Sequence, residues 1–473
     1  MESHANSVED YLIEGLSFKL TPGASYINQR RSVSFFPQGG NSYAPNGVRV
    51  IKMSLTGDQW LDPATIRIMF DLTNNATEDP GHKANLADRR AYQKYLRPIS
   101  GPWSFFRRMR ILCGGQVIED IDQYNACHEM FSNLRSYSKA ENDMIEGFGQ
   151  AGNILRCENY HPTLPRQNCF TFGGIYPGDT MTVTFKPLSG IFNQPKYLPL
   201  RYMNGLTIEF EVVSDPNDPV VYPSIDNNGS SVQGHFSQAC CSNNWVIGNV
   251  QCKCDLVQLD NGLENEYAQH LLSGKALPIS YDTYVYQFQV VPSSNFSCNI
   301  ARSFTRLKSA FVTLNKVITG SLGSDSLPVV GQEMRKSWNN FYHPSEHSDD
   351  ILSSDQVEFQ IQVGSRLFPE YPCRSLQEAF SMLSKTLGIS PSAWHGVNII
   401  PEEWRDNKFV FAVDFEKVLE AGFSGLNTKA GDLMTIKINQ RDVPTLNLAT
   451  GMRVILHSDN ILNVRDTGVE VFD

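Results

Sequence analysis

The sequence of this 473-residue chain lacks the features of a membrane-spanning or phosphate-binding protein. No apolar run approaches the roughly 18 residues that a helix needs to cross a bilayer. Asp and Glu number 50 against 40 Lys and Arg, which gives a net charge of −10, and no Lys/Arg run exceeds two residues. Proteins that bind DNA or RNA usually carry a basic patch, so we expect no direct sequence-specific binding of nucleic acid.

The amino terminus also lacks a secretion signal, because Met1–Asn6 shows no charged segment followed by an apolar one. We therefore expect the protein to be made in a reducing compartment and to remain there. In such a compartment its ten cysteines are expected to be free thiols and not a disulfide framework.

Helical periodicity is scarce, and alternation of apolar and polar residues dominates instead. Turn-forming residues at 46–47, 177–179 and 431–432 separate the alternating segments, as in an antiparallel sandwich. No strand–helix–strand rhythm is present, so a parallel doubly wound sheet is not expected. The clearest alternating segments are 66–72, 181–185, 208–212, 284–290, 357–363 and 436–438.

One motif occurs twice, about 250 residues apart. The first copy begins with Gly-Gly-Gln-Val-Ile-Glu at 114–119 and ends with Glu-Met-Phe-Ser-Asn-Leu at 129–134. The second begins with Gly-Ser-Arg-Leu-Phe-Pro at 364–369 and ends with Glu-Ala-Phe-Ser-Met-Leu at 378–383. Each copy predicts a strand, a tight glycine turn, a second strand and a short amphipathic helix. A repeat of this length indicates a duplicated domain.

In the second copy, Ser375 and Glu378 predict a capping box, and Gly388 predicts the end of the helix. The helix of the first copy is expected to begin near Asn125, and its Phe131 corresponds to Phe380 in the second copy.

The repeat and the composition together predict the domain organisation. An amino-terminal arm at 1–29 has little alternation, and a stretch rich in Pro, Asn, Gly and Ser at 214–239 is the expected linker. The first domain is then expected at 30–213 and the second at 240–473. Long loops between the strands are typical of a binding or assembly face. The longest expected loops are 74–102, 135–168, 318–355 and 388–407.

Metal and nucleotide motifs are absent or poorly formed. His343 and His347 have ligand spacing for a helix, but Pro344 between them favours a loop. Cys240-Cys241 and Cys252-x-Cys254, near His235, lack the two to four residues that usually separate paired zinc ligands. The chain has neither a P-loop nor a Gly-x-Ser-x-Gly element. We expect no metal, no cofactor and no catalytic residue.

Two groups of charged residues are candidate sites. The pairs Glu119-Asp120 and Glu402-Glu403 could serve glycoside hydrolysis, but adjacent residues of a strand face opposite ways. We therefore interpret these carboxylates as solvated edges. The cluster at 107–110 (Arg-Arg-Met-Arg) is expected to alternate outward and to pair with acids of a neighbouring chain or loop.

Three motifs resemble a known family. The segment 114–119 resembles the Gly-Gly-Gln-hydrophobic-Ile-acidic turn of double jelly-roll major capsid proteins from large and mid-sized double-stranded DNA viruses. Residues 198–203 (Leu-Pro-Leu-Arg-Tyr-Met), which lead into 206–212, are similar to the Leu-Pro-Leu segment before the last strand of their first jelly roll. Residues 364–372 are similar to capsid proteins of Polinton-type elements and virophages.

The resemblance implies an all-β fold of two tandem eight-stranded antiparallel jelly rolls, with a few short helices in loops. It further implies a major capsid protein that forms a homotrimeric pseudo-hexagonal capsomer. Such capsomers self-assemble into an icosahedral shell around a double-stranded DNA genome. The arm at 1–29 would then lie inside the shell and contact neighbouring chains.

The same resemblance implies the partners and the location. The expected partners are neighbouring capsomers and penton and minor capsid proteins, and contact with an internal membrane stays open. The protein would be found in the virion after assembly in the host cytoplasm or nucleus.

An enzyme or a carbohydrate-binding protein on a tandem jelly-roll scaffold is the alternative. A copper enzyme should show His-x-His spacing, which the chain lacks. A carbohydrate-binding module would use exposed aromatic side chains, so four tryptophans stay open as candidates. These are Trp245, Trp338, Trp394 and Trp404.

Overall fold

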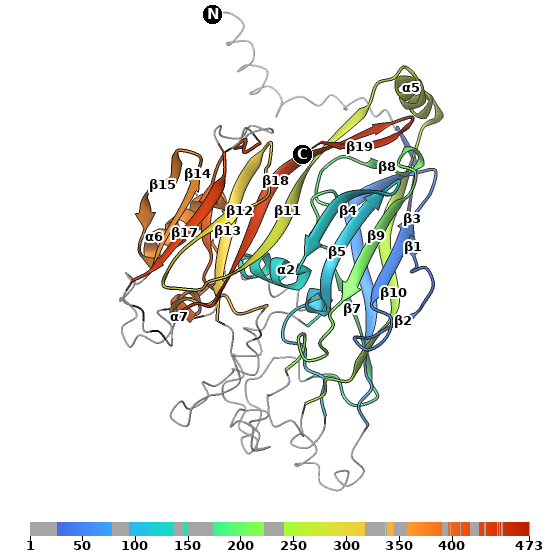
Figure 1. Cartoon of the computed structure of the whole chain (residues 1–473). Coiled ribbons are helices and arrows are strands. Elements are labelled where there is room, and N and C mark those ends of the chain that lie inside the picture. The colour runs from blue at the N-terminus through green and yellow to red at the C-terminus, as the bar shows by residue number, and fades with distance from the viewer. Residues whose placement is uncertain are drawn as a thin grey trace, which may run out of the picture.

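Two β-sandwiches lie side by side in the computed structural model (Figure 1). The first is built mainly from the amino-terminal half of the chain and the second from the carboxy-terminal half. The structure describes residues 26–77, 94–136, 145–148, 174–221, 241–316, 336, 338–344, 357–389, 396–397, 399–406, 408–416, 425–429, 432–441, 443, 445 and 448–472. The expected arm therefore lies almost wholly outside the described residues.

The first sandwich consists of two antiparallel sheets. One has the strand order β1-β10-β4-β7, with the short strands β2 and β8 paired to β10 and β4, and the other has the order β3-β9-β5-β6. The strands are β1 Ile27–Phe35, β2 Ser42–Tyr43, β3 Val50–Leu55, β4 Trp60–Asn74, β5 Phe106–Cys113, β6 Gln116–Asp122, β7 Thr180–Phe185, β8 Leu198–Pro199, β9 Leu206–Val212 and β10 Trp245–Leu259.

The second sandwich repeats this topology. Its sheets have the orders β11-β18-β13-β16, with β19 paired to β18, and β12-β17-β14-β15. Each main strand thus has a counterpart in the first sandwich, and each sandwich is an eight-stranded jelly roll. The predicted fold class is confirmed. The strands are β11 Leu277–Val290, β12 Asn295–Ile300, β13 Leu307–Asn315, β14 Val357–Val363, β15 Arg366–Cys373, β16 Phe411–Asp414, β17 Met434–Gln440, β18 Gly451–Arg465 and β19 Gly468–Phe472.

The repeated motif occupies equivalent places in the two sandwiches. Gly114 turns β5 into β6 with φ +56°, and Gly364 turns β14 into β15 with φ +58°. Both values lie in the left-handed region, which glycine adopts without steric strain because it has no Cβ atom. A helix follows each hairpin: α2 (Tyr124–Asn133) in the first and α6 (Leu376–Thr386) in the second. The duplication read from the sequence is therefore confirmed by strand order.

The helix signals were largely correct. The Ser375 side chain accepts a hydrogen bond from the Glu378 amide at 3.1 Å, as the capping box predicts. The Glu378 carboxylate instead accepts from the Arg374 amide at 3.1 Å. Helix α2 begins one residue earlier than expected, at Tyr124, because Gln123 adopts a left-handed conformation with φ 45° just before it.

The division between the domains differs from the prediction. Strand β10 pairs with both β1 and β4, so residues 245–259 belong to the first sandwich and not to the second. The Pro-rich and Asn-rich stretch therefore precedes the last strand of the first sandwich. The connection between the sandwiches runs through α5 (Asn261–Leu272), which is held to β4 by the Trp60 indole N–H donating to Glu264 at 3.0 Å.

Alternating burial explains why these segments are strands. On β4, every second side chain from Ile66 to Leu72 is fully buried in the sandwich interior, and β9 shows the same pattern from Leu206 to Val212. The remaining short helices are η2 (Pro102–Phe105), η3 (Leu200–Tyr202) and α7 (Pro401–Asp406). Over the described ranges, none of the helices combines the length and the apolar character needed to cross a membrane.

Candidate functional site at the seam between the two sandwiches

The seam is the surface where the first sandwich packs against the sheet β11-β18-β13-β16 of the second. Residues 451–456 of β18 are buried without alternation, because one face of this sheet meets its own core and the other meets the first sandwich. The Phe131 ring on α2 lies 4.8 Å from Tyr284 and 5.2 Å from Phe311, measured between ring centroids. Helix α2 thus anchors the seam.

The counterpart of Phe131 has a different role. Phe380 on α6 packs edge-on against Trp404 of α7, with ring centroids 5.3 Å apart, entirely within the second sandwich. The duplicated helix therefore joins the two sandwiches in one copy and closes its own sandwich in the other.

A loop of the first sandwich touches β11 through bare backbone. A Cβ atom added to Gly190 would lie 1.5 Å from the carbonyl oxygen of Asp282, far inside any allowed contact. Only glycine permits this approach. Nearby, Lys196 Nζ donates to the Pro278 carbonyl at 2.8 Å, and the Tyr281 hydroxyl donates to the Ile118 carbonyl at 2.9 Å.

Glu119 lies behind this loop and is buried, which corrects the expectation of a solvated edge. The Gly190 amide donates to Glu119 Oε1 at 2.8 Å, and the Ser189 hydroxyl donates to Glu119 Oε2. Burial raises the pKa of Glu119 to about 7, although these hydrogen bonds oppose the rise. The cause is a β-bulge: Ile111 pairs with Glu119 but Leu112 pairs with Val117, so Ile118 and Glu119 both face inward.

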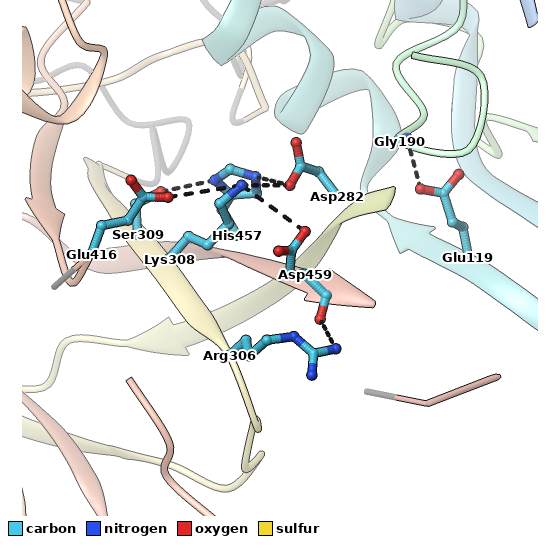
Figure 2. A network of polar contacts seen from close by, with 9 residues as sticks. All are labelled: Glu119, Gly190, Asp282, Arg306, Lys308, Ser309, Glu416, His457 and Asp459. Carbon is cyan, nitrogen blue, oxygen red and sulfur yellow. Dashed lines mark hydrogen bonds and ion pairs between the residues drawn. The ribbon is translucent and has the colours of Figure 1, made fainter. Parts of the chain in front are cut away.

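A polar network on the second sandwich adjoins the same contact (Figure 2). Asp282 accepts from Lys308 Nζ at 2.9 Å and lies 3.2 Å from His457 Nε2. Burial alone would raise the pKa of Asp282, but His457 and Lys308 together hold it below its usual range. Burial raises the pKa of the neighbouring Asp459 to about 6.

Ser309, His457 and Asp282 form a chain of contacts that resembles a hydrolase triad. Ser309 Oγ lies 3.1 Å from His457 Nδ1. However, Ser309 is only 4% exposed, on a strand paired on both sides, so a substrate has no access to its hydroxyl. The network therefore has a structural role: it holds the strands β11, β13 and β18 in register.

Two arginines of the cluster pair within their own sheet, which differs from the expected pairing with acids of a neighbouring chain or loop. The third, Arg107, fits the expectation, because its charge opposes the rise in the pKa of the loop residue Asp218 that burial causes. Arg108 forms a two-pronged contact with Asp120 at 2.8 and 2.6 Å, and Arg110 lies 2.9 Å from Glu209. These pairs follow from strand register, because β5 lies between β6 and β9. Since the arginine side chains in these pairs stay partly exposed to solvent, the pairs contribute little to stability.

The cysteine and histidine candidates do not assemble. Cys252 and Cys254 are buried on β10, and His343 is buried against the Phe409 ring with its pKa lowered to about 3 by that burial. His235, Cys240 and His347 lie outside the described residues. Within the part of the chain that the structure describes, no three His, Cys, Asp or Glu residues are placed to hold a metal ion.

The remaining candidates from the sequence that the structure describes are either buried or paired with a neighbouring side chain. Trp245, Trp338 and Trp404 are buried and so are not exposed platforms for a carbohydrate, while Trp394 lies outside the described residues. Glu403 pairs with Lys408 Nζ at 2.9 Å; nothing is described of the Glu402 side chain.

Comparisons with known proteins bear on the fold. No protein-family model matches the chain, and no curated protein is similar to it in sequence. Solved structures are similar in shape. PBCV-1 VP54, fitted into a reconstruction of the virophage Sputnik, has a TM-score of 0.56 and 13% identity, covering 97% of this chain and 100% of that chain.

Two further structures show the same extent of likeness. A quasi-atomic model of the PBCV-1 virus capsid has a TM-score of 0.54 at 12% identity and covers 97% of this chain and 100% of that one. The Faustovirus major capsid protein has a TM-score of 0.54 at 9% identity and covers 96% and 93%. The chain therefore has the double jelly-roll fold of these capsid proteins, and the resemblance read from the sequence is confirmed for the fold.

Proposed function

We propose that this chain is a major capsid protein whose homotrimer is a pseudo-hexagonal capsomer of an icosahedral shell around a double-stranded DNA genome. The observation that carries the proposal is the duplicated jelly roll with its likeness, over nearly the whole chain, to viral capsid structures. Three chains with two similar sandwiches each supply six similar wedges, which suits a hexagonal lattice. The partners are then neighbouring capsomers, penton and minor capsid proteins and an internal membrane, within the virion.

The exposed apolar side chains support a head-to-tail contact between copies. Phe36, Val48 and Val50 are exposed beside the edge strand β3, whereas Leu367 and Tyr371 are exposed on the edge strand β15. Figure 1 places β3 and β15 at opposite ends of the molecule. If β3 of one copy contacts β15 of the next and the copies are related by a three-fold rotation, the contacts close into a ring. Both edge strands of every copy are then covered.

The first test is the mass of the purified protein. Three chains of 53.1 kDa give about 160 kDa, and a permanent interface should preserve this species at nanomolar concentration. Tyr371, which is 79% exposed, is the natural target. Tyr371→Asp is expected to yield monomers in mass photometry, because the charge would be buried at the ring contact.

Leu272→Asp is the matched control, since Leu272 is exposed on α5, which is part of neither edge strand, and its loss should leave the 160 kDa species intact. A wild-type protein that is monomeric, or a Tyr371→Asp protein that still forms trimers, would contradict the head-to-tail arrangement. Negative-stain images with hexagonal outlines would support the capsomer, and round or irregular outlines would not.

The arm provides a second test. Residues 1–25 lie outside the described residues, and β1 begins at Ile27. If the arm connects neighbouring capsomers, deletion of residues 1–20 should leave the trimer intact and lower the yield of closed shells several-fold. Electron microscopy of assembly reactions measures that yield. Full yield from the truncated chain would exclude the arm from assembly.

A further inference from the structure

Strand β1 forms one edge of the first sandwich and is poorly covered. Its one strand neighbour among the described residues is β10. The side chains of the consecutive residues 27–32 are exposed, so both faces of this part of the strand meet solvent. The pairing with β10 therefore holds this part of β1, and its outer edge offers backbone N–H and C=O groups to a further strand.

The counterpart of β1 in the second sandwich is covered. Strand β11 lies beside β18 in its sheet, as β1 lies beside β10. The first sandwich covers β11, where the Tyr281 hydroxyl donates to the Ile118 carbonyl of β6 at 2.9 Å. The described residues give β1 no such neighbour, so its cover would come from a segment outside them.

The segment directly before β1 has the sequence of a strand followed by a turn. Residues 16–20 read Leu-Ser-Phe-Lys-Leu, so apolar and polar side chains alternate as they do in a strand. Pro22 and Gly23 follow, and this pair suits the two central positions of a type II turn. Residues 21–26 between this run and β1 are long enough for a β-hairpin loop that contains the turn.

Charge complementarity favours the same segment. Residues 1–25 contain four Asp or Glu residues and one lysine, which gives them a net charge of −3. Strand β1 contains Arg30 and Arg31 and no acidic residue. Arg30 is paired with two aspartates of its own sheet, whereas Arg31 donates to the neutral side chain of Gln59 at 2.9 Å. An acidic segment is therefore better suited to this edge than a basic one.

We propose that residues 16–20 add to the outer edge of β1 as an antiparallel strand, so that the amino-terminal arm and β1 of the same chain form a β-hairpin. Backbone hydrogen bonds hold the added strand, as they hold a peptide that extends a sheet. Its end at the turn lies beside Ile27, whose side chain is 40% exposed without it. Its other end brings Glu14 toward Arg31, where an ion pair adds to the cross-strand contacts.

The hairpin goes beyond the proposed capsid role and does not depend on it, because it forms within one chain. It leaves residues 1–13, which span roughly 40 Å when extended, to reach a neighbouring copy. The two proposals also have separate measurements. The mass of the particle tests the capsomer, and the exchange of backbone amides tests the hairpin.

Hydrogen–deuterium exchange of the full-length protein, measured by mass spectrometry, is the experiment. We expect residues 16–20 and β1 to be protected, and deletion of residues 1–20 to speed exchange in β1 about tenfold, because several cross-strand pairs are lost. Strand β17 of the second sandwich is the internal reference, and equal exchange there shows that the truncated chain is folded. Equal exchange of β1 in the two proteins would overturn the proposal.

Two variants locate the contacts of the added strand. Phe18→Ser removes the central apolar side chain of residues 16–20, and β1 should then exchange as fast as in the truncated protein. Tyr11→Ser is the matched control, because it makes the same kind of change in the arm but outside the added strand, and β1 should exchange as in the wild type. Equal exchange in the two variants would count against the hairpin.

Monomeric protein shows which copy supplies the strand. Tyr371→Asp provides the monomer, or the wild type itself does if it forms no trimer. The protection of β1 should persist in this monomer, because the strand comes from the same chain. Protection that is present in the trimer and lost in the monomer would assign the strand to a neighbouring copy and would contradict the hairpin.

Discussion

Replacement of Gly190 by alanine is expected to force the two jelly rolls apart and to lower the free energy of unfolding by about 3 kcal/mol or more. The added Cβ would lie 1.5 Å from the Asp282 carbonyl oxygen and 2.4 Å from the carbonyl carbon. Both are backbone atoms of a paired strand, so no side-chain rotation can relieve the clash. The same shift would pull Ser189 and the Gly190 amide away from Glu119.

Thermal unfolding and limited proteolysis measure this effect. Gly190→Ala should melt well below the wild type and should be cleaved sooner near the seam. Gly57→Ala is the matched control in the same sandwich, because its nearest new contact, with the Leu256 side chain at 3.9 Å, is ordinary van der Waals packing. A Gly190→Ala protein that melts with the wild type would show that the seam is not rigid in solution.

Alternation and repetition were sufficient to predict the architecture. The apolar residues of β4 and β9 recur at every second position and all face a core, so their strands could be read from the sequence. Gly114 and Gly364 marked the duplicated hairpins. These signals are local, since each depends on residues within one element.

The errors arose where a local pattern was interrupted. The bulge at Ile118 placed two consecutive side chains of β6 inside, and no residue in that segment marks a bulge. Strand β10 has good alternation, but its position depends on strands about 190 residues away, as in the hydrogen bond from the Asp255 amide to Thr65. The composition of residues 214–239 favoured a domain boundary before β10, because long loops within a domain and linkers between domains are rich in the same residue types.

The seam itself had no signal in the sequence. Ser189 lies 70 residues from Glu119, Tyr281 lies 163 residues from Ile118, and His457 lies 148 residues from Ser309. Each of these residues is common in strands and loops. Tyr281 meets Ile118 only when the two sandwiches dock, whereas the other two pairs form within one sandwich, through strand pairing or the placement of a loop. The alternation within each strand specifies none of these meetings.

Glu119 makes the stability of the seam depend on pH. Its pKa is raised by burial from an ordinary value of 4.5 to about 7, so the folded protein holds this proton more tightly than the unfolded chain. The resulting stabilisation is complete below pH 4.5 and is lost as the pH rises to about 7. At 1.36 kcal/mol per pKa unit, the loss is about 3 kcal/mol. Asp459 acts in the same direction but over a lower range, up to about pH 6.

Asp282 acts in the opposite direction but outside this window. Its pKa is held below the ordinary value of 3.8, so its contribution is present above that pH and is lost only in stronger acid. Among the described carboxylates of the seam, Glu119 is therefore the main source of any fall in stability between pH 6 and 8. Ionised Glu119 has no cation among its described partners, and Asp282 lies across the loop from it.

Glu119→Gln is therefore expected to flatten the stability profile between pH 6 and 8, where the wild type should lose stability. The amide oxygen of glutamine can still accept from the Gly190 amide, so the fold of the loop is preserved without a titrating group. Urea unfolding at successive pH values gives the profile. Asp120→Asn removes the adjacent carboxylate, which pairs with Arg108 outside the seam, and should keep the wild-type slope. Parallel profiles for Glu119→Gln and the wild type would mean that the buried carboxyl does not change its protonation in this range.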